Sequence, residues 1–319
     1  MTDLNLESKF LGGLLGSALG DCVGEIAFYM DNRVHLAQQV KSKSEIIYTD
    51  DTAMAIGITE ALIENEGTLD PDLLGQIFHR NFEREPHRGY AMGPPTIFSE
   101  VDRTGKSYTE VASELFNGTG SYGNGASMRI APIGLFYYDS SNLYELAKKS
   151  AMVTHAHPLG IDGAAVLAKA ISILVDKDCQ KWDVWDHREE YLEILIDFAQ
   201  TEVYKKKLRQ VVTYLSPDKE LSFCSYELGS NVKSFESVPF SICAFLKNPH
   251  SFYDCILDTV MVSADRDTIG AMVGGLLGAY LGIDSIPQEW LERLENREYL
   301  RDLALKLIQL KSIRNNNLI

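Results

Sequence analysis

The apolar residues of this chain recur with helical spacing along nearly its whole length. A repeat of three or four residues places apolar side chains on one face of a helix. Alternation with a period of two, which is typical of strands, is confined to short runs such as Phe136-Tyr137-Tyr138. The pattern therefore predicts an all-α protein. Its clearest stripes are Leu74, Ile77, Phe78 and Phe82; Tyr108, Val111, Ala112, Leu115 and Phe116; and Leu300, Leu303, Ala304, Leu307 and Ile308.

Helix boundaries and the lack of linkers indicate how the chain is organised. Proline is favoured in the first turn of a helix, and Pro71, Pro158 and Pro287 stand where such turns are expected. The polar segment Asp176–Glu220 predicts a peripheral pair of helices. No linker rich in proline, serine or glycine and no block of charge divides the sequence. We therefore expect a single domain over residues 1–319.

Two segments carry glycine at every fourth position. Glycine inside a helix costs roughly 0.5–1 kcal/mol relative to alanine, so a row of four needs a compensating gain. Close packing of two helix backbones in the core is the simplest such gain. The two rows lie at positions 12, 16, 20 and 24 and at positions 270, 274, 278 and 282.

The amino-acid composition limits the kinds of molecule that the protein is expected to bind. The 319 residues are 45% hydrophobic and 24% charged, which is typical of a globular protein with an ample core. The formal net charge of −15 argues against a surface that tracks nucleic-acid phosphates, since such a surface needs clustered lysine and arginine. A small anionic ligand that is held locally remains compatible with this charge.

Cysteine usage and hydropathy predict a cytoplasmic protein. The five cysteines are scattered, odd in number and without a CxxC pair, which indicates buried thiols in a reducing compartment. The acidic start Met1–Glu7 does not resemble a signal peptide. The longest apolar run, Ile269–Ile283, has 15 residues and is rich in glycine. It predicts a buried helix and no membrane span.

Four oxygen-bearing side chains crowd one predicted helix start, in Thr49-Asp50-Asp51-Thr52. A helix start needs a single capping oxygen. Carboxylate and hydroxyl oxygens are also the ligands of hard cations such as Mg²⁺. On this motif alone, an over-supplied cap is favoured over half of a metal site.

A second acidic group opens one of the glycine-rich helices, where Asp265 and Asp267 flank Arg266 and Thr268 adds a hydroxyl. Alone, this group could be a cap paired with the arginine. Its likeness to the first group favours metal binding, because two carboxylate pairs at two helix starts could hold two divalent ions about 3.5–4 Å apart.

Two further motifs could bind a ligand. The glycine-rich segment Gly118–Arg129 leaves backbone N–H groups free for an anion such as a diphosphate, although a turn without a ligand is equally compatible. In Thr154-His155-Ala156-His157, the two histidines are two residues apart and cannot share a helix face. His155 could contact a ligand or cap a helix, and His157 precedes a helix entry.

Together these motifs resemble the ADP-ribosylglycohydrolase family. In order and spacing they cover nearly the whole chain. The resemblance rests on Gly20-Asp21-Cys22-Val23-Gly24, Thr49–Thr52, Gly120–Gly125, Thr154-His155 and Asp265-x-Asp267-Thr268-Ile269. The chain looks most like the branch that removes ADP-ribose from serine and degrades poly(ADP-ribose), through Arg88-Gly89-Tyr90, Phe116-Asn117-Gly118, Glu227-Leu228-Gly229 and Phe235–Pro239.

The resemblance implies a compact, orthogonal multi-helix domain with two Mg²⁺ ions, which Mn²⁺ could replace, at the bottom of an ADP-ribose cleft. The implied metal ligands are Thr49, Asp50, Asp51, Asp265, Asp267 and Thr268. The implied substrate contacts are the diphosphate loop Gly120, Ser121, Tyr122, Gly123 and Asn124, the adenine neighbours Phe116 and Tyr122, the ribose neighbours Gly89, Gly93 and His155, and Val232.

Two departures from the family pattern concern catalysis. The family usually has a glutamate four residues after the glycine that aligns with Gly24, and Phe28 stands there. Glu25 lies about one helical turn earlier and is the candidate replacement. Otherwise a water activated by Asp50 or Asp51 must suffice, or the protein is slow or inactive. Arg266 replaces a usual threonine, and it either forms an outward salt bridge or partly replaces a cation.

The sequence therefore predicts a Mg²⁺-dependent hydrolase that releases ADP-ribose from serine, from poly(ADP-ribose) or from an O-acyl conjugate. Its predicted catalytic residues are Glu25, Asp50, Asp51 and Asp267. An arginine-directed hydrolase is one alternative, and a non-catalytic binder or structural descendant is another. We expect an ADP-ribosylated protein or ADP-ribose conjugate as the partner, no nucleic acid and no membrane, and a monomeric protein.

Overall fold

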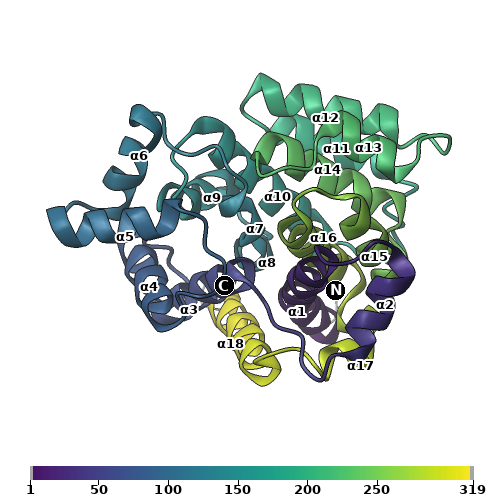
Figure 1. Ribbon diagram of the computed structural model, residues 1–319, viewed down its shortest axis with the longest axis horizontal. Coiled ribbons are helices and arrows are strands. Elements are labelled where there is room, and N and C mark those ends of the chain that lie inside the picture. Colours follow the sequence, from purple (N-terminus) through teal and green to yellow (C-terminus); the bar gives the residue numbers. More distant parts are fainter. Residues whose placement is uncertain (1–2, 317–319) are drawn as a thin grey trace.

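The computed structural model describes residues 3–316, which form α-helices joined by loops (Figure 1). In this range, β pairing is limited to two isolated bridges, Ile46 with Leu294 and Gly123 with Lys233. The predicted all-α class is confirmed. The helices are α1 (Asp3–Ala27), α2 (Arg33–Ser42), α3 (Asp50–Glu64), α4 (Pro71–Arg84), α5 (Gly93–Thr104), α6 (Tyr108–Gly118), α7 (Gly125–Met128), α8 (Ala131–Phe136), α9 (Leu143–Met152), α10 (Pro158–Asp176), α11 (Arg188–Phe198), α12 (Glu202–Tyr214), α13 (Leu221–Leu228), α14 (Ser234–Lys247), α15 (Phe252–Val262), α16 (Arg266–Leu281), a 3₁₀ turn (Ile283–Ser285), α17 (Gln288–Leu291) and α18 (Arg297–Asn316).

Local sequence explains several helix starts. Pro71 is in the first turn of α4, where the Asp70 side chain accepts hydrogen bonds from the backbone. Pro158 opens α10 in the same way, after the capping side chain of His157. Both placements confirm the prediction. Pro287 differs, because it is the N-cap residue of α17 and lies just outside its first turn.

The two glycine-rich helices, α1 and α16, pack against each other in antiparallel directions at the centre of the fold (Figure 1). A Cβ atom added to Gly20 would lie 1.9 Å from the carbonyl oxygen of Gly270, and one added to Gly12 would lie 2.5 Å from that of Gly278. No side chain larger than hydrogen fits at such a distance. The predicted close approach of two backbones is confirmed, and it fixes the ends of both helices relative to each other.

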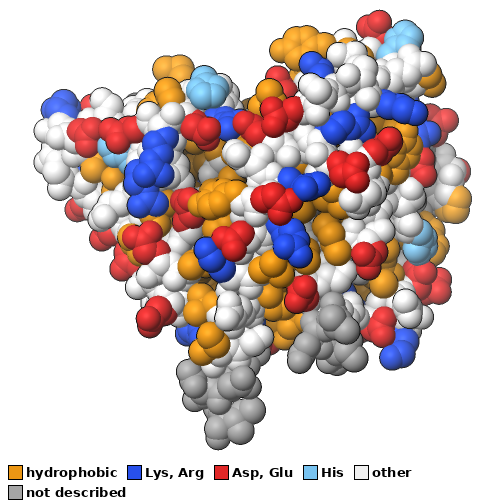
Figure 2. All heavy atoms as spheres, turned by 90° about the horizontal axis from the view of Figure 1, so that it is seen from below, with side chains coloured by type: hydrophobic (Ala, Val, Ile, Leu, Met, Phe, Trp, Pro, Cys, Tyr) orange, Lys and Arg blue, Asp and Glu red, His pale blue; other side chains and the backbone are white. Residues whose placement is uncertain are grey.

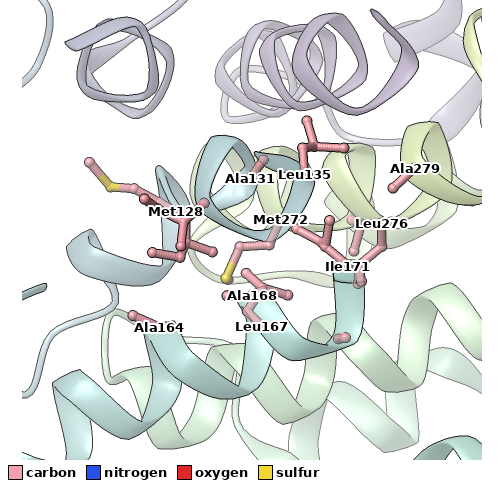
Figure 3. Packing of buried hydrophobic residues seen from close by; sticks show 14 of the residues in the cluster. Met128, Ala131, Leu135, Ala164, Leu167, Ala168, Ile171, Met272, Leu276 and Ala279 are labelled. Carbon is pink, nitrogen blue, oxygen red and sulfur yellow. The ribbon is translucent and has the colours of Figure 1, made fainter. Parts of the chain in front are cut away.

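The buried apolar side chains form one continuous cluster around this pair, which agrees with a single domain. Figure 3 shows part of it, where Ile171 of α10 and Leu276 of α16 lie next to each other and Leu135 of α8 points toward α1. All three side chains are at most 1% exposed. The burial of this apolar surface is the main force that holds the helices around the centre.

One predicted stripe is wrong at its end. Tyr108, Val111 and Ala112 are buried in α6, but the helix is interrupted from Leu115 to Asn117. Phe116 has a φ of 53° in the left-handed region, and 63% of it is exposed. Helical spacing cannot reveal such a break, since the apolar pattern continues through it.

Two other predictions concern the outer helices and the membrane. The segment Asp176–Glu220 contains the helices α11 and α12, as expected. α1 and α10 each contain a stretch long and apolar enough to cross a membrane, but 89% and 83% of the respective windows are buried inside the fold. Packing in a protein core accounts for the apolar character of both helices.

Candidate active site

A cavity of about 370 Å³ lies where the starts of α3 and α16 face the loop that precedes α7. It brings together most of the residues that the sequence predicts for the site. Thr49, Glu25, Gly120 and Tyr122 are the predicted residues that do not line it. Those that do are Asp50, Asp51, Gly89, Gly93, Phe116, Ser121, Gly123, Asn124, His155, Val232, Asp265, Asp267 and Thr268.

At the start of α3, the cap uses one side chain. Thr49 is the N-cap residue, and its hydroxyl accepts the Asp51 N–H at 3.4 Å. The carboxylates of Asp50 and Asp51 are therefore in excess of what the helix start needs. Helix capping therefore does not explain why the motif has two carboxylates.

Asp21, on α1, holds the start of α3 in place. It is fully buried and accepts hydrogen bonds from the backbone N–H and hydroxyl groups of both Thr49 and Thr52, at 2.5–3.1 Å. The sequence motifs did not predict this role of Asp21. The signal that could have found it is a lone carboxylate within an otherwise apolar, glycine-rich helix, because a buried charge needs partners.

At the start of α16, the carboxylates are held by neighbouring groups. Asp267 Oδ1 accepts the Thr268 N–H at 2.8 Å, and Asp265 Oδ2 accepts the Asn124 side-chain amide at 2.6 Å. The backbone N–H of Asp265 donates to the Ser230 carbonyl at 2.9 Å. The loop after α13 and the loop before α7 thus both support this end of the cavity.

The aspartates repel one another when they are ionised. Burial, together with the charges of neighbouring aspartates, raises the pKa of Asp50 and of Asp265 to about 7. Burial and the charge of Asp267 raise the pKa of Asp21 to about 7, although its threonine hydrogen bonds oppose the shift. The pKa of Asp51 is raised well above its ordinary value for the same reasons. Such a cluster needs a compensating positive charge to be fully ionised near neutral pH.

The composition of the cluster fits a hard divalent cation. Asp51 Oδ1 is buried and has no hydrogen-bond partner among the described residues, which makes it an acceptor that is free for a ligand. Carboxylate and threonine oxygens are the donors that Mg²⁺ prefers. Within residues 3–316, no three His, Cys, Asp or Glu side chains already form a group arranged to hold an ion. Metal binding therefore stays a proposal.

The glycine-rich loop contributes Ser121, Gly123 and Asn124 to the cavity wall. Gly120 has a φ of 71°, and a Cβ there would lie 2.7 Å from the His157 backbone nitrogen. Gly120 thus permits a close approach of two loops. The half-exposed Tyr122 ring packs edge-on against the His157 ring, with centroids 5.4 Å apart, outside the cavity lining.

The rest of the cavity wall is mixed in character. Phe116 is held there by the left-handed backbone described above, and Val232, like Phe116, is 63% exposed. Gly89 has a φ of 90°, and Gly93 has open space at its Cβ position. This wall offers an apolar surface beside the polar loop, as a ligand with an aromatic base and a phosphate would require.

Two buried residues near His155 were missed as site residues. Arg129 and Thr154 line the cavity beside it, and the sequence motifs that contain them did not predict this. Burial and the Arg129 charge lower the pKa of His155 to about 3. His157 is the histidine that caps a helix, through a hydrogen bond from the Leu159 N–H. A cationic residue inside an apolar stretch was the available signal for Arg129.

Glu25, the candidate replacement for the family's glutamate, and Arg266, which departs from the family pattern, both lie near Asp267. Glu25 lines a separate cavity, and partial burial together with the charge of Asp267 raises its pKa. Arg266 points away from the aspartates, and donates hydrogen bonds to the carbonyl oxygens of Ala27 and Met30 at the end of α1 and to that of Ser263. Both expectations for Arg266, an outward salt bridge and a substitute cation, are wrong, because its partners are backbone carbonyls.

Comparisons with known proteins give a consistent result. The family model described as ADP-ribosylglycohydrolase matches residues 2–317. The chain is 32% identical to the ADP-ribosylhydrolase ARH3 of Xenopus tropicalis over 95% of both chains, and 30% identical to that of Homo sapiens over 94% and 93%. A solved ADP-ribosylglycohydrolase-related protein complex has the same fold, with a TM-score of 0.68 at 22% identity over 97% of this chain and 99% of that one.

Proposed function

Because the chain belongs to the ADP-ribosylglycohydrolase family, it is a glycohydrolase, and we propose that it cleaves the bond between ADP-ribose and an acceptor in the cavity described above. We propose serine-linked ADP-ribose, poly(ADP-ribose) and O-acyl-ADP-ribose as its substrates. One observation carries the proposal. Four aspartates meet at one side of a cavity whose other walls are a glycine-rich loop and an apolar surface.

The chemistry of the bond suits these residues. Cleavage at the anomeric carbon develops oxocarbenium character, and carboxylates usually serve as acid, base or nucleophile in such reactions. Asp50 lines the cavity and would transfer the proton if Glu25 does not. Asp51 and Asp267 lie in the same wall and would stabilise positive charge at the sugar.

We propose that Thr49, Asp50 and Asp51 hold one Mg²⁺ and that Asp265, Asp267 and Thr268 hold a second, with Mn²⁺ able to substitute. When bound, the ions would supply the positive charge that positions ribose hydroxyls and lowers the pKa of a water. The unpaired Asp51 Oδ1 and the raised pKa values of the cluster support this assignment. Asn124 and Asp21 keep their partners oriented by hydrogen bonds.

The opposite part of the cavity would bind the nucleotide. In the loop around Ser121, the backbone N–H groups that have no acceptor among the described residues would face a diphosphate, and Phe116 offers a ring face to adenine. The Ser121 hydroxyl accepts the Gly123 N–H at 3.1 Å, which orders the loop in advance of binding. Less ordering is then required when the ligand arrives.

We also propose a monomeric cytoplasmic protein that acts on ADP-ribosylated protein or on ADP-ribose conjugates without binding nucleic acid. On the face drawn in Figure 2, Lys and Arg side chains are interspersed with Asp and Glu side chains. Such interspersion, together with the net charge of −15, gives little attraction for a polyanion.

A second candidate function is ADP-ribose binding without catalysis. It is favoured by Phe28, which stands where the family usually has a glutamate and whose side chain is 45% exposed. Arginine-linked ADP-ribose is the alternative substrate within the hydrolase class. Turnover on serine-linked and arginine-linked substrates, combined with calorimetry of ADP-ribose, separates these functions.

The expected result is turnover on the serine-linked substrate that stops in EDTA and returns with Mg²⁺ or Mn²⁺. Asp267→Ala should abolish turnover and metal binding, whereas Asp302→Ala, at an exposed ion pair with Lys306, should change neither. Binding of ADP-ribose without any release of acceptor would establish the non-catalytic function. Full activity after chelation would remove the metal from the proposal.

A further inference from the structure

We propose that Arg129, acting through Thr154, holds His155 as a neutral imidazole that donates its Nε2 hydrogen into the cavity. Arg129 and Thr154 are then positioning residues, and His155 is the group that contacts the ligand. The contact with an oxygen of ADP-ribose rests on the proposed function. The hydrogen-bond relay itself is a property of the free protein.

The guanidinium of Arg129 is fully buried and fixed from several sides. Its Nη2 donates to the Thr154 hydroxyl at 2.7 Å and to the Ser150 carbonyl at 3.2 Å. Its Nη1 contacts the Met54 sulfur at 3.4 Å, and its plane lies over the Phe78 ring, 4.6 Å from the centroid. A group held in this way has one orientation, so the hydrogen bond to Thr154 is a fixed feature of the fold.

The direction of the next hydrogen bond follows from counting hydrogens. A guanidinium only donates, so the Thr154 oxygen accepts from Arg129. His155 Nδ1 lies 2.7 Å from the same oxygen. If Nδ1 carried a hydrogen, Thr154 would accept twice, and its own hydrogen would have no acceptor among the described residues. Thr154 is 1% exposed, and an unpaired buried hydroxyl is costly. Thr154 therefore donates to Nδ1.

The charge of the imidazole follows from its surroundings. His155 lies beside the Arg129 cation and is 8% exposed, and both conditions oppose a second positive charge. With Nδ1 acting as an acceptor, a neutral imidazole must carry its hydrogen on Nε2. His155 is thus a hydrogen-bond donor toward the cavity, and neither a metal ligand through Nε2 nor a general base.

The glycine-rich loop leaves room for this donor. The Nε2 atom lies 3.3 Å from the position that a Cβ on Gly123 would occupy and 3.0 Å from that on Gly125. A side chain at either position would crowd the imidazole. Because His155 lines the same cavity as the aspartates, an acceptor oxygen of a sugar or a phosphate is the ligand group that this N–H would meet.

Nitrogen-15 NMR of His155 in the free protein tests the relay independently of function. We expect a protonated Nε2 and an unprotonated Nδ1 at pH 7. In Thr154→Val the Nδ1 atom loses its donor, so we expect a mixture of tautomers, and Thr154→Ser should restore the single tautomer. A protonated Nδ1 in the wild-type protein, or an unchanged tautomer in Thr154→Val, would overturn the proposal.

Calorimetry with ADP-ribose tests the consequence of the relay. Thr154→Val should weaken binding about tenfold, as the loss of one oriented hydrogen bond predicts, and Thr154→Ser should bind as the wild type. Thr59→Val is the matched control, since it removes a buried hydroxyl that donates to the Ala55 carbonyl within α3. Equal weakening by Thr59→Val would contradict a specific role of Thr154.

The proposed function and the hydrogen-bond relay can be contradicted by different results. If the wild-type protein does not bind ADP-ribose, the proposed function fails, and the NMR measurement still decides the tautomer. If it binds ADP-ribose but Thr154→Val binds equally well, the relay fails as a positioning device while the function stands. Arg129→Lys, which keeps the charge and loses the fork, should behave as Thr154→Val. Should this variant not fold, the two Thr154 variants decide.

Discussion

Gly274 on α16 and Gly16 on α1 face each other so closely that a Cβ on Gly274 would lie 2.0 Å from the carbonyl oxygen of Gly16. The adjacent Gly275 differs, because the nearest atom to its Cβ position is the Ala131 Cβ at 3.4 Å, which is an ordinary contact. Two neighbouring glycines of one helix therefore have opposite roles. The first permits the packing of two backbones, and the second only lowers helix propensity.

We predict that Gly274→Ala destabilises the protein by about 1–3 kcal/mol or more, because the added methyl group must push two backbones apart. Gly275→Ala should instead stabilise it by up to about 1 kcal/mol, since alanine favours the helix and restricts the unfolded chain. Urea unfolding of both variants measures the two free energies. Equal effects would contradict the asymmetry between the two positions.

The spacing of the glycines predicted close helix packing, but it could not predict the register. Any two glycine faces can meet in principle, in either direction. The pairing of Gly12 with Gly278 and of Gly20 with Gly270 depends on the whole core, which closes around both helices. Because α16 begins beside the end of α1, this register brings Asp267 close to Gly24. The sequence shows the two acidic groups, but it does not show that the packing of α1 against α16 determines where they lie.

Asp21 provides the second prediction. Asp21→Asn replaces one carboxylate oxygen with an NH₂ group that cannot accept, so the hydrogen bonds that need this oxygen are lost, either from the Thr49 hydroxyl at Oδ1 or from the Thr52 N–H and hydroxyl at Oδ2. We expect a loss of about 2–4 kcal/mol in the free energy of unfolding and at least tenfold weaker Mg²⁺ binding, since Asp21 orients the start of α3. Asp302→Asn, at the exposed ion pair on α18, is the control and should change neither quantity.

The acidic cluster makes a prediction about pH. Asp50 and Asp265 have pKa values of about 7 in the folded protein, above their ordinary value of 3.8 in the unfolded chain. Between these values the folded state binds more protons, so the metal-free protein loses stability as the pH rises from about 4 to about 7. The slope is about 1.4 kcal/mol per pH unit for each net proton.

Added Mg²⁺ should reverse this trend, because a cation binds the ionised carboxylates. The difference in melting temperature between samples in Mg²⁺ and in EDTA should therefore increase from pH 5 to pH 8. Melting curves at each pH measure this difference in melting temperature. Titrating groups elsewhere in the protein affect both samples equally, so their contribution cancels. A difference that does not change with pH would show that the cluster does not bind the ion through ionised aspartates.

The hydrogen-bond partners of Arg266 could not be predicted from the sequence. An arginine between two acidic residues favours a salt bridge or a role at the cation site, and only the position of α1 reveals backbone acceptors within its reach. Such capping of the last carbonyls satisfies groups that a helix end leaves free. Arg129 is a similar case, since its partners come from α3, α4 and α9 and from the turn after α9.

We predict that Arg266→Thr, which restores the residue usual in the family, destabilises the protein by about 1–3 kcal/mol, since the Ala27 and Met30 carbonyls lose the guanidinium donor and Ala27 keeps only the Met30 N–H. Mg²⁺ affinity should change less than threefold, because the guanidinium points away from the aspartates. Unfolding and Mg²⁺ titration measure the two effects. Arg103→Thr, at an exposed pair with Glu100, is the control and should cost less than about 0.5 kcal/mol.

Glu25 provides the last prediction. It lies on α1 one residue after Gly24, whose Cβ position is 2.5 Å from the Asp267 Cα atom, so Glu25 and Asp267 belong to neighbouring elements in close contact. Partial burial and the charge of Asp267 raise the Glu25 pKa, as a general acid requires. We expect Glu25→Gln to lower kcat at least about 100-fold with unchanged ADP-ribose affinity.

Glu45→Gln is the matched control, because Glu45 lines the same outer cavity of about 280 Å³ as Glu25 and is exposed. It should leave kcat unchanged. A loss below twofold in Glu25→Gln would transfer the acid–base role to Asp50 or Asp51, whose carboxylates line the main cavity. In that case, Asp50→Asn should lower kcat at least about 100-fold at saturating Mg²⁺, because Asp50 would then activate the attacking water. The kcat values of the two variants therefore assign the proton transfer to one residue or the other.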